Sequence, residues 1–501
     1  MNFNTLSGSA KFMKKLEIRA MGQTTPSGEV PNIAVLCAVD RFSNLRLVEQ
    51  IALGVKTKGG IVSVVDVPAF GFLRKINPMT AEYAASFAQT AASNAEAIIR
   101  CGLYDGVVIV ADCDVTAAGL LTGAARANCP ALVISVGVSA GASDTKDFKT
   151  AGLVAGGKLN ARQGDDLVRQ ATDRSGVSVN FNSVSTFFIL CEAMGLCVPT
   201  ASTTQMNSAP HFRNAAATGE AIFESAKNVL APKKFLTRAA LGNAIAFIIS
   251  IGGDVSAIST VTNLVSIYEK IPHEIIAEYS AKVPLLVEPQ EQNCDTFMAK
   301  YSIAKIYKYL AATPKLIDET ALDFTGERLR NILAATESAE LAPVSKTARV
   351  YLVRGSACEN GGYVQATENT PASISGKAWV YSSLEDADKA LAAGSIPDGS
   401  VVVVQNCADI SVSALCYTVE GMERQIAIVT DGLCDKTSIL AVTRCSPDTF
   451  ANEEFANIQN GDQIEIDLGR GRINTSASAK DLKIRAKRND VKKPVLYFGQ
   501  G

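Results

Sequence analysis

The alternation of short apolar runs with longer helical segments between about residues 30 and 140 constrains the fold most. The apolar runs are rich in β-branched residues and cover residues 33–37, 61–66, 107–111 and 131–135. The segments between them, such as 44–59 and 80–101, have helical periodicity. Apolar strands separated by helices are typical of a parallel sheet with helices on both faces. We therefore predict an α/β fold for the N-terminal part.

The pattern of the sequence changes twice after residue 140. Residues 180–340 favour helices, and the polar, proline-containing stretch 334–345 is a candidate linker. Beyond it, short strand-like runs alternate with tight-turn sequences such as Pro397-Asp-Gly399 and Asn460-Gly-Asp462. We predict an α/β domain over residues 1–340 and a smaller, β-rich, barrel-like domain over 346–480. Residues 481–501 form a basic tail, which we interpret as a solvated terminal surface.

Charge and hydropathy exclude several classes of protein. Lys and Arg number 48 against 50 Asp and Glu, so the sequence favours no nucleic-acid partner. No run approaches the ~18 apolar residues of a membrane span, and the first 22 residues lack the apolar core of a secretory signal. We expect a cytoplasmic protein without a membrane partner. Twelve scattered cysteines and two histidines also argue against a disulfide framework, zinc fingers and a Ser-His-Asp triad.

Segments spread over nearly the whole chain match the motifs of one family in the same order. They are 104–114, which ends in Cys113-Asp114, then 129–134, 191–199, 236–253, 428–432, 446–447 and 460–467. Together they resemble the dihydroxy-acid dehydratase and phosphogluconate dehydratase family. The resemblance implies dehydration of sugar acids or dihydroxy acids. In that family three cysteines hold an iron–sulfur cluster that acts on the departing hydroxyl, Mg²⁺ holds the carboxylate side of the substrate, and a serine takes the proton.

The resemblance places one cluster ligand on Cys113 and leaves the other two without a cysteine. Those two positions fall near Asp40 and on Ser178. Cys37 lies close to the first. Cys191 lies thirteen residues beyond Ser178, mostly along a predicted helix, which at ~1.5 Å per residue is close to 20 Å away. We therefore expect no iron–sulfur cluster. Cys113 remains the candidate cofactor-binding residue, with a small buried apolar role as the alternative.

Asp66 and Asp114 occupy the two aspartate positions that the resemblance assigns to the Mg²⁺ site. The lysine that follows the second aspartate in the family is Val115 here, and the family's glutamate has no counterpart in residues 405–413. We predict that the two aspartates follow adjacent strands. Two carboxylates there could hold Mg²⁺ together with waters and substrate oxygens. The alternative is that they are solvated or capping aspartates.

The serine that acts as the base in the family is replaced by Asp435. Its neighbours Cys434 and Lys436 could also act as base or nucleophile if their pKa values were lowered. These three residues are the candidate catalytic residues. The family's substrate-holding Gly-Gly-Ser-Thr-Asn is Gly252–Ser256 here, and we expect Asp254 within it to repel an anionic group.

The departures fall on the functional loops, whereas the strands and helices between them keep their pattern. The leading hypothesis is a divergent family member, a pseudoenzyme of amino-acid or sugar-acid metabolism without cluster-dependent activity. It would be a binding, regulatory or assembly subunit with a small-molecule ligand, as a homodimer or as the partner of an intact homologue. One alternative is a cluster-free lyase that acts on a small polar or hydroxy-acid metabolite with Mg²⁺. The other is an active dehydratase with rearranged cluster ligands.

Overall fold

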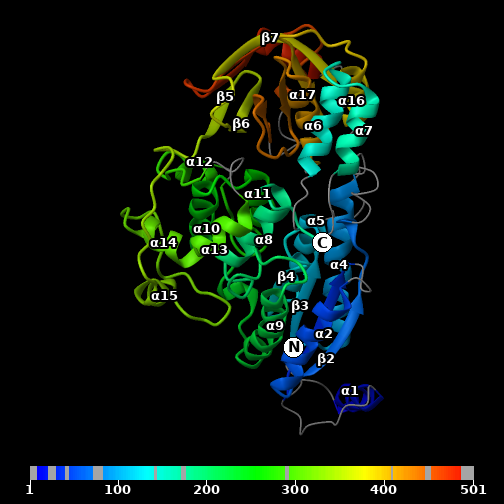
Figure 1. Cartoon of the computed structure of the whole chain (residues 1–501), viewed down its shortest axis with the longest axis vertical. Helices are drawn as coiled ribbons and strands as arrows, with labels where there is room; N and C mark the ends of the chain where they lie inside the picture. The colour runs from blue at the N-terminus through cyan, green and yellow to red at the C-terminus, as the bar shows by residue number, and fades with distance from the viewer. Residues whose placement is uncertain are drawn as a thin grey trace.

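Two domains make up the chain, and Figure 1 shows the parallel sheet of the first below the barrel of the second. The computed structural model describes residues 8–20, 30–39, 44–71, 83–139, 144–170, 176–272, 274–287, 293–407, 410–445 and 453–486. All structural statements below refer to these residues. Among them, no helix is long and apolar enough to cross a membrane.

The N-terminal domain is built on a four-stranded parallel sheet. Its strands are β1 (Asn32–Ala38), β2 (Ile61–Asp66), β3 (Gly106–Ala111) and β4 (Ala131–Ser135), in the order β2-β1-β3-β4. All three strand pairs are parallel. β1, β3 and β4 are buried along their whole length, as the continuous apolar runs predicted. The predicted α/β class of this part is confirmed.

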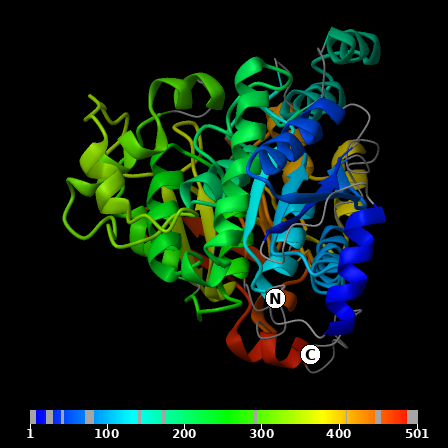
Figure 2. The ribbon, with the colours of Figure 1, turned by 90° about the horizontal axis from the view of Figure 1, so that it is seen from below.

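Helices cover both faces of this sheet. The chain passes from β1 to β2 in one direction and from β3 to β4 in the other, and right-handed crossovers in opposite directions lie on opposite faces. Accordingly α2 (Leu45–Thr57) packs with α9 (Ala209–Lys227), and α4 (Ala84–Gly102) packs with α5 (Asp114–Arg126). Figure 2 shows these helices around the sheet. The strand order reverses between β1 and β3, and sheets of this kind bind ligands beyond the carboxyl ends of the strands at such a point.

Small residues let the paired helices approach closely. A Cβ on Gly54 of α2 or on Gly219 of α9 would lie 2.1 Å from a carbonyl oxygen of the opposite helix. Gly119 and Gly123 of α5 approach α4 in the same way, at 2.5 and 2.3 Å. Any larger side chain at these four positions would push the helices apart.

The other helices of this domain complete its core or lie at its edges. α8 and α10 are buried along most of their length, which explains their apolar composition. In the described residues these helices are α1 (Gly8–Ala20), α6 (Asp144–Ala155), α7 (Ala161–Gln170), α8 (Ser183–Ala193), η3 (Pro232–Lys234), α10 (Arg238–Ser250), α11 (Val255–Val265), α12 (Ile275–Ser280), α13 (Cys294–Lys300), α14 (Ile303–Ala311) and α15 (Leu329–Ala335).

The C-terminal domain is an eight-stranded mixed sheet that nearly closes into a barrel, which confirms the predicted β-rich, barrel-like domain. Its order is β10-β9-β8-β7-β11-β12-β5-β6. The two edge strands meet where Tyr363 of β6 and Thr443 beside β10 exchange two backbone hydrogen bonds of 2.8 and 2.9 Å. The strands are β5 (Val350–Gly355), β6 (Cys358–Gln365), β7 (Ser373–Tyr381), β8 (Val401–Val404), β9 (Ala427–Thr430), β10 (Ala441–Val442), β11 (Gln463–Asp467) and β12 (Arg472–Thr475).

Two predicted turns and three helices lie between these strands in the described residues, and a fourth helix follows the last strand. Gly399 and Gly461, within the two predicted tight-turn sequences, adopt positive φ values of 76° and 89°, which glycine accommodates without strain. The helices are α16 (Leu384–Ala392), α17 (Ser413–Met422), α18 (Glu453–Ala456) and α19 (Ala479–Ala486). The sequence pattern did not predict α16 and α17.

An arm of the N-terminal domain packs on the barrel domain. α6 crosses α17, and the two helices touch through glycines: a Cβ on Gly152 would lie 2.1 Å from Thr418 O, and one on Gly421 would lie 2.1 Å from Lys149 O. Beside this crossing the Lys149 ammonium pairs with Glu420 at 2.8 Å. Figure 1 shows α6 and α7 beside α16 and α17, away from the rest of their own domain. The first domain therefore completes the packing of the second.

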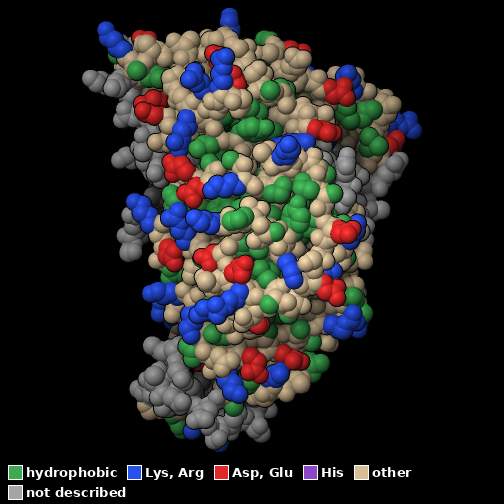
Figure 3. Space-filling view, turned by 90° about the vertical axis from the view of Figure 1, so that its left-hand side faces the viewer, with side chains coloured by type: hydrophobic (Ala, Val, Ile, Leu, Met, Phe, Trp, Pro, Cys, Tyr) green, Lys and Arg blue, Asp and Glu red, His purple; other side chains and the backbone are tan. Residues whose placement is uncertain are grey.

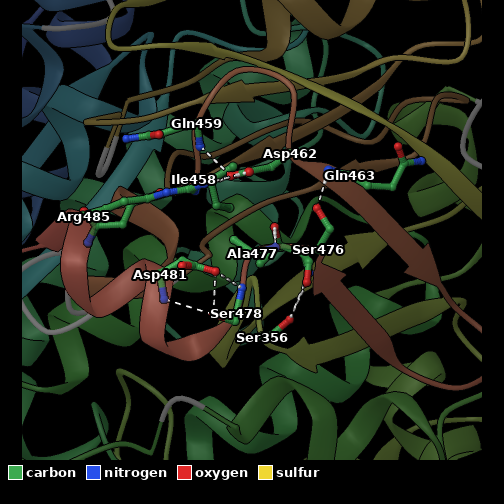
Figure 4. Close-up of polar contacts among 12 residues, drawn as sticks. Ser356, Ile458, Gln459, Asp462, Gln463, Ser476, Ala477, Ser478, Asp481 and Arg485 are labelled. Atoms are coloured by element: carbon green, nitrogen blue, oxygen red, sulfur yellow. Dashed lines mark hydrogen bonds and ion pairs between the residues drawn. The ribbon is translucent and has the colours of Figure 1, made fainter.

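The last described helix, α19, is anchored to the barrel by ion pairing (Figure 4). Arg485 donates from two nitrogens to the carboxylate of Asp462, at 2.6 and 3.1 Å, and also to Asn457 O at 3.2 Å. The Ser478 hydroxyl caps the helix by accepting from the backbone N–H of Asp481. The start of the predicted basic tail is thus a docked helix, and residues 487–501 lie outside the described part.

Charges of both signs are interspersed on the surface that carries α14 and α15 (Figure 3). Hydrophobic side chains gather across the middle of this face.

Candidate functional site

Candidate residues of the first domain lie at the carboxyl end of its sheet. Asp66 is the last residue of β2 and is exposed, whereas Asp114 follows β3 and begins α5. The prediction that they follow adjacent strands is wrong, because β1 lies between β2 and β3. Two strand spacings amount to roughly 10 Å. A shared Mg²⁺ at Asp66 and Asp114 stays a prediction, and it would require both side chains to reach across the width of β1.

Asp114 makes short-range contacts at the start of its own helix. Its Oδ1 accepts from the backbone N–H of Val115 at 3.0 Å and from the thiol of Cys113 at 3.4 Å. A carboxylate at a helix N-terminus is favoured by the helix dipole without any ligand. The geometry therefore matches the capping alternative for Asp114.

Cys113 is buried in a small apolar cluster. Phe70 and Ala84 form this cluster with it, and Phe87 and Val115 pack against it. The segment after β2 folds over this position, since the Phe70 N–H donates to the Thr116 hydroxyl at 3.0 Å. This environment suits a small apolar side chain rather than a ligand that faces an open site.

The two other cluster positions do not supply ligands. Asp40 lies outside the described residues, and Cys37 is buried within β1. The Ser178 hydroxyl accepts from the Asn180 N–H at 3.2 Å. Cys191 is buried in α8. Within the described part of the chain, no three His, Cys, Asp or Glu residues are placed to hold a metal ion, so these residues do not fit the family's cluster.

One cysteine near these positions escaped the sequence analysis. The thiol of Cys294, at the start of α13, donates to Ser178 O at 3.9 Å. Burial raises its pKa to about 12, so the thiol remains protonated at neutral pH. The two residues are 116 positions apart in the sequence, so no local pattern indicated this contact.

The turn 252–256 forms a second contact between the two domains, besides the crossing of α6 and α17. The backbone N–H of Lys436 donates to Asp254 Oδ2 at 2.9 Å, and the Ser256 hydroxyl donates to Cys434 O at 3.0 Å. Gln365 of β6 binds the same turn twice: its Nε2 donates to Gly253 O at 2.7 Å, and its Oε1 accepts from the backbone N–H of Val255 at 3.1 Å. These four hydrogen bonds fix the turn to the barrel domain.

Asp254 is fully buried in this contact. It caps α11, where its Oδ1 accepts from the backbone N–H of Ser256 at 2.7 Å. Burial, and next the nearby carboxylate of Asp435, raise its pKa well above the usual value. Asp254 is therefore a buried residue of the domain contact and not an open charge in front of an anionic ligand, as the sequence suggested.

The candidate catalytic residues Cys434, Asp435 and Lys436 lie on the other side of this contact. The Cys434 thiol donates to the Asp435 carbonyl at 3.1 Å and contacts the thiol of Cys416. That thiol contact, followed by burial, raises the pKa of Cys434 well above its usual value. Asp435 is 7% exposed, and its N–H donates to the Ser413 hydroxyl at 2.8 Å. A protonated, buried thiol is a poor nucleophile.

The two groups of candidate residues face the same side of the first domain. α5 and α11 pack side by side, and the Tyr268 hydroxyl, just beyond the C-terminus of α11, donates to Ala125 O near the C-terminus of α5. The helices therefore run in the same direction, and their N-terminal ends, at Asp114 and Asp254, both lie towards the barrel domain (Figure 1).

Gln365 is the main residue of this site that the sequence did not indicate. It ends β6, a strand that was not predicted because Gly361 and Gly362 interrupt its apolar pattern. Its role depends on contacts across 110 and 112 residues of sequence. No local signal marks such a residue.

An α/β domain whose turn 252–256 and helix α6 pack against a mixed barrel defines the class: a two-domain protein with a parallel α/β sheet and a β-barrel. The chain belongs to the dihydroxy-acid/6-phosphogluconate dehydratase family. The model described as "Dihydroxy-acid/6-phosphogluconate dehydratase N-terminal" matches residues 34–332, and its C-terminal counterpart matches residues 338–499. The resemblance inferred from the motifs is thereby confirmed.

Relatives of similar length carry the name dihydroxy-acid dehydratase. The protein of Carboxydothermus hydrogenoformans is 25% identical over 98% of this chain and 95% of its own length. The protein of Caldanaerobacter subterraneus subsp. tengcongensis is 26% identical over 88% of this chain and 84% of its own. The protein of Ignicoccus hospitalis is 27% identical over 88% of this chain and 85% of its own length. The similarity therefore extends over both domains.

Proposed function

We propose that this chain is a family member without iron–sulfur-dependent dehydratase activity that acts as a binding, regulatory or assembly subunit. The observation that carries the proposal is the docking of the turn 252–256. The resemblance makes this segment the substrate-holding one, whereas here Gln365, Cys434 and Lys436 engage it through hydrogen bonds from the barrel domain. Groups already bonded to the protein offer little to a substrate.

The remaining parts of the site support the same proposal. The Cys113 side chain packs among apolar residues while its thiol donates to the Asp114 carboxylate, and the carboxylates of Asp66 and Asp114 follow strands separated by β1. The Cys434 thiol is buried against Cys416. Each residue is accommodated structurally where the family's chemistry would require an exposed ligand or base.

The full chain, purified without oxygen, provides the test. Iron, sulfide and the visible absorption spectrum are measured before and after cluster reconstitution, and dehydration of a dihydroxy acid and of 6-phosphogluconate is then assayed. A dihydroxy-acid dehydratase with its cluster serves as the positive control. We expect no stoichiometric iron and no turnover. Iron, sulfide and activity together would restore the dehydratase with rearranged ligands.

A cluster-free lyase is the second candidate, and one observation favours it. The buried carboxylate of Asp254 and that of Asp435 interact strongly enough to raise the pKa of Asp254. Coupled carboxylates of this kind serve as acid and base in many enzymes. This function would use a divalent ion at Asp66 and Asp114 and act on a small hydroxy acid. If this function is correct, a ligand should stabilise the chain against unfolding only when Mg²⁺ is present. The double variant Asp66→Ala, Asp114→Ala should abolish this Mg²⁺-dependent stabilisation.

We also propose that the subunit works in the cytoplasm as a homodimer or beside an intact homologue. The support for this proposal is the match of both domains to relatives over most of their length. Light scattering coupled to gel filtration distinguishes the alternatives. A dimeric mass supports the homodimer, whereas a monomer that shifts to a larger species only with an intact homologue supports the mixed assembly.

A further inference from the structure

A cavity lies in the first domain, away from the turn 252–256. It has a volume of about 260 Å³ and lies between α8, α10, α13, α14 and the segment 321–332. The cavity meets α10 near Ala240 and Asn243, whereas the turn 252–256 follows the opposite end of that helix. At ~1.5 Å per residue, the 9 to 12 residues from Asn243 and Ala240 to position 252 separate the two places by roughly 14–18 Å. The cavity is therefore independent of the candidate site.

Apolar side chains dominate the walls of this cavity. Its larger side chains are Met194, Met298, Tyr307, Leu322, Phe324 and Ile332. Leu322 and Phe324 are only partly buried. Methionine side chains adapt readily to the shape of an apolar partner.

The polar groups in the walls are already engaged by the protein. The Glu192 carboxylate accepts from the backbone N–H groups of Thr200 and Ser202, at 2.7 and 3.0 Å, and from the Ser202 hydroxyl at 2.6 Å. The Asn243 side chain exchanges two hydrogen bonds with the backbone of Asp318, at 2.8 and 2.7 Å. The Tyr307 hydroxyl donates to the Ala193 carbonyl at 2.9 Å. A ligand would therefore gain its affinity mainly from apolar contact.

The charges of the walls restrict the ligand further. The described wall residues include the acidic Glu192 and Asp323 but no Lys, Arg or His. Asp323 is held by its own loop, where Oδ1 accepts from the N–H groups of Thr325 and Glu327. An anion would enter an apolar space beside two carboxylates with no cation to compensate it.

We infer that this cavity binds an uncharged, largely apolar molecule of about the size of a two-ring aromatic. An apolar cavity of ~150 Å³ is enough to hold benzene in another protein, so 260 Å³ accommodates a larger ring system. The inference goes beyond the proposed function, because it assigns a ligand class to a place that the domain contact does not reach. The expected ligand is uncharged and therefore differs from the carboxylic acids that the family's name implies.

Two probes that share one ring system test the charge argument. Indole is uncharged, and indole-3-acetate adds a carboxylate to the same rings. Titration calorimetry with the full chain should show saturable one-to-one binding of indole and at least tenfold weaker binding of indole-3-acetate. Absence of indole binding, or equal or tighter binding of indole-3-acetate, would overturn the inference.

Blocking variants test the location. Ala304→Phe on α14 and Ala321→Phe in the facing segment place a ring in the cavity, and each should weaken indole binding at least tenfold. Ala312→Phe is the matched control, since Ala312 is exposed at the end of α14 and outside the cavity walls. Circular dichroism and the melting temperature without indole establish that each variant is folded. Undiminished binding in both folded variants would refute this site, even if indole binds.

Discussion

The Asp254 carboxylate and the backbone N–H of Lys436 are joined by a 2.9 Å hydrogen bond across the domain junction. One side chain of the first domain thus holds a loop of the second at the position where the family resemblance places a catalytic serine. The nearby carboxylate of Asp435 opposes ionisation of Asp254. The contact is therefore sensitive to charge as well as to shape.

Burial, and next the carboxylate of Asp435, raise the pKa of Asp254, which predicts a pH dependence of stability. Since the pKa of Asp254 is higher in the folded chain than its unfolded value of about 3.9, the folded chain holds the proton more tightly. The free energy of unfolding should then fall as the pH rises above about 4 and through the folded pKa. Asp435→Asn removes the repelling charge and should make this fall smaller. Urea unfolding at several pH values measures both curves.

Asp165→Asn, at an exposed position of α7, is the control for this comparison. It should leave the pH profile as in the wild type. If Asp435→Asn also leaves the profile unchanged, the two carboxylates do not interact as described.

Gln365→Ala should destabilise the chain by about 2–3 kcal/mol. The substitution removes both hydrogen bonds to the turn 252–256 and leaves a carbonyl and an N–H without their partner. The control is Gln463→Ala, which removes a 3.0 Å hydrogen bond to the hydroxyl of Ser375 at an exposed position and should cost less than about 1 kcal/mol. Denaturant midpoints measure the difference. Equal losses in the two variants would contradict a docking role for Gln365.

Gly152→Ala should weaken the packing of α6 on α17. The new Cβ would lie 2.1 Å from the carbonyl oxygen of Thr418, so the helices must separate, at a cost of about 1–3 kcal/mol. Gly8→Ala serves as the control, because nothing lies within 4 Å of a Cβ there. Melting temperature and limited proteolysis around α6 report the change. A variant as stable and as resistant as the wild type would show that the crossing tolerates a side chain.

The thiols should differ sharply in reactivity. Cys101 is exposed, and the other cysteines are buried. The raised pKa of Cys434 further disfavours its reactive thiolate. Iodoacetamide should therefore modify Cys101 rapidly in the native chain and Cys434 only after unfolding, as located by mass spectrometry. Cys101→Ser should remove the rapid reaction. Rapid native labelling of Cys434 would instead favour a nucleophilic role.

Local sequence patterns were enough to predict the two domain types. β1, β3 and β4 are fully buried and so consist of continuous apolar residues, which is a signal within a few positions. Strand order carries no such signal. The expected adjacency of Asp66 and Asp114 failed because β1, the first strand of the sheet, lies between β2 and β3.

The candidate site depended even more on distant contacts. The motifs located Asp254 and Asp435, but not the burial of both in one domain contact. Gln365 stands at the end of an irregular, glycine-containing strand, and its partners lie more than a hundred residues earlier. Such relationships arise from how the domains dock, which residue type and spacing do not encode.

The glycine crossing of α6 and α17 also bears on how the chain folds during synthesis. Gly421 is made about 270 residues after Gly152. At ~5–20 residues per second, α6 waits on the order of 15–50 s for the helix on which it rests. By the end of that interval the rest of the first domain has been synthesised, whereas its α6 arm still has no place to pack. The nascent chain should thus remain open to chaperones and proteases at this arm until the barrel emerges from the ribosome.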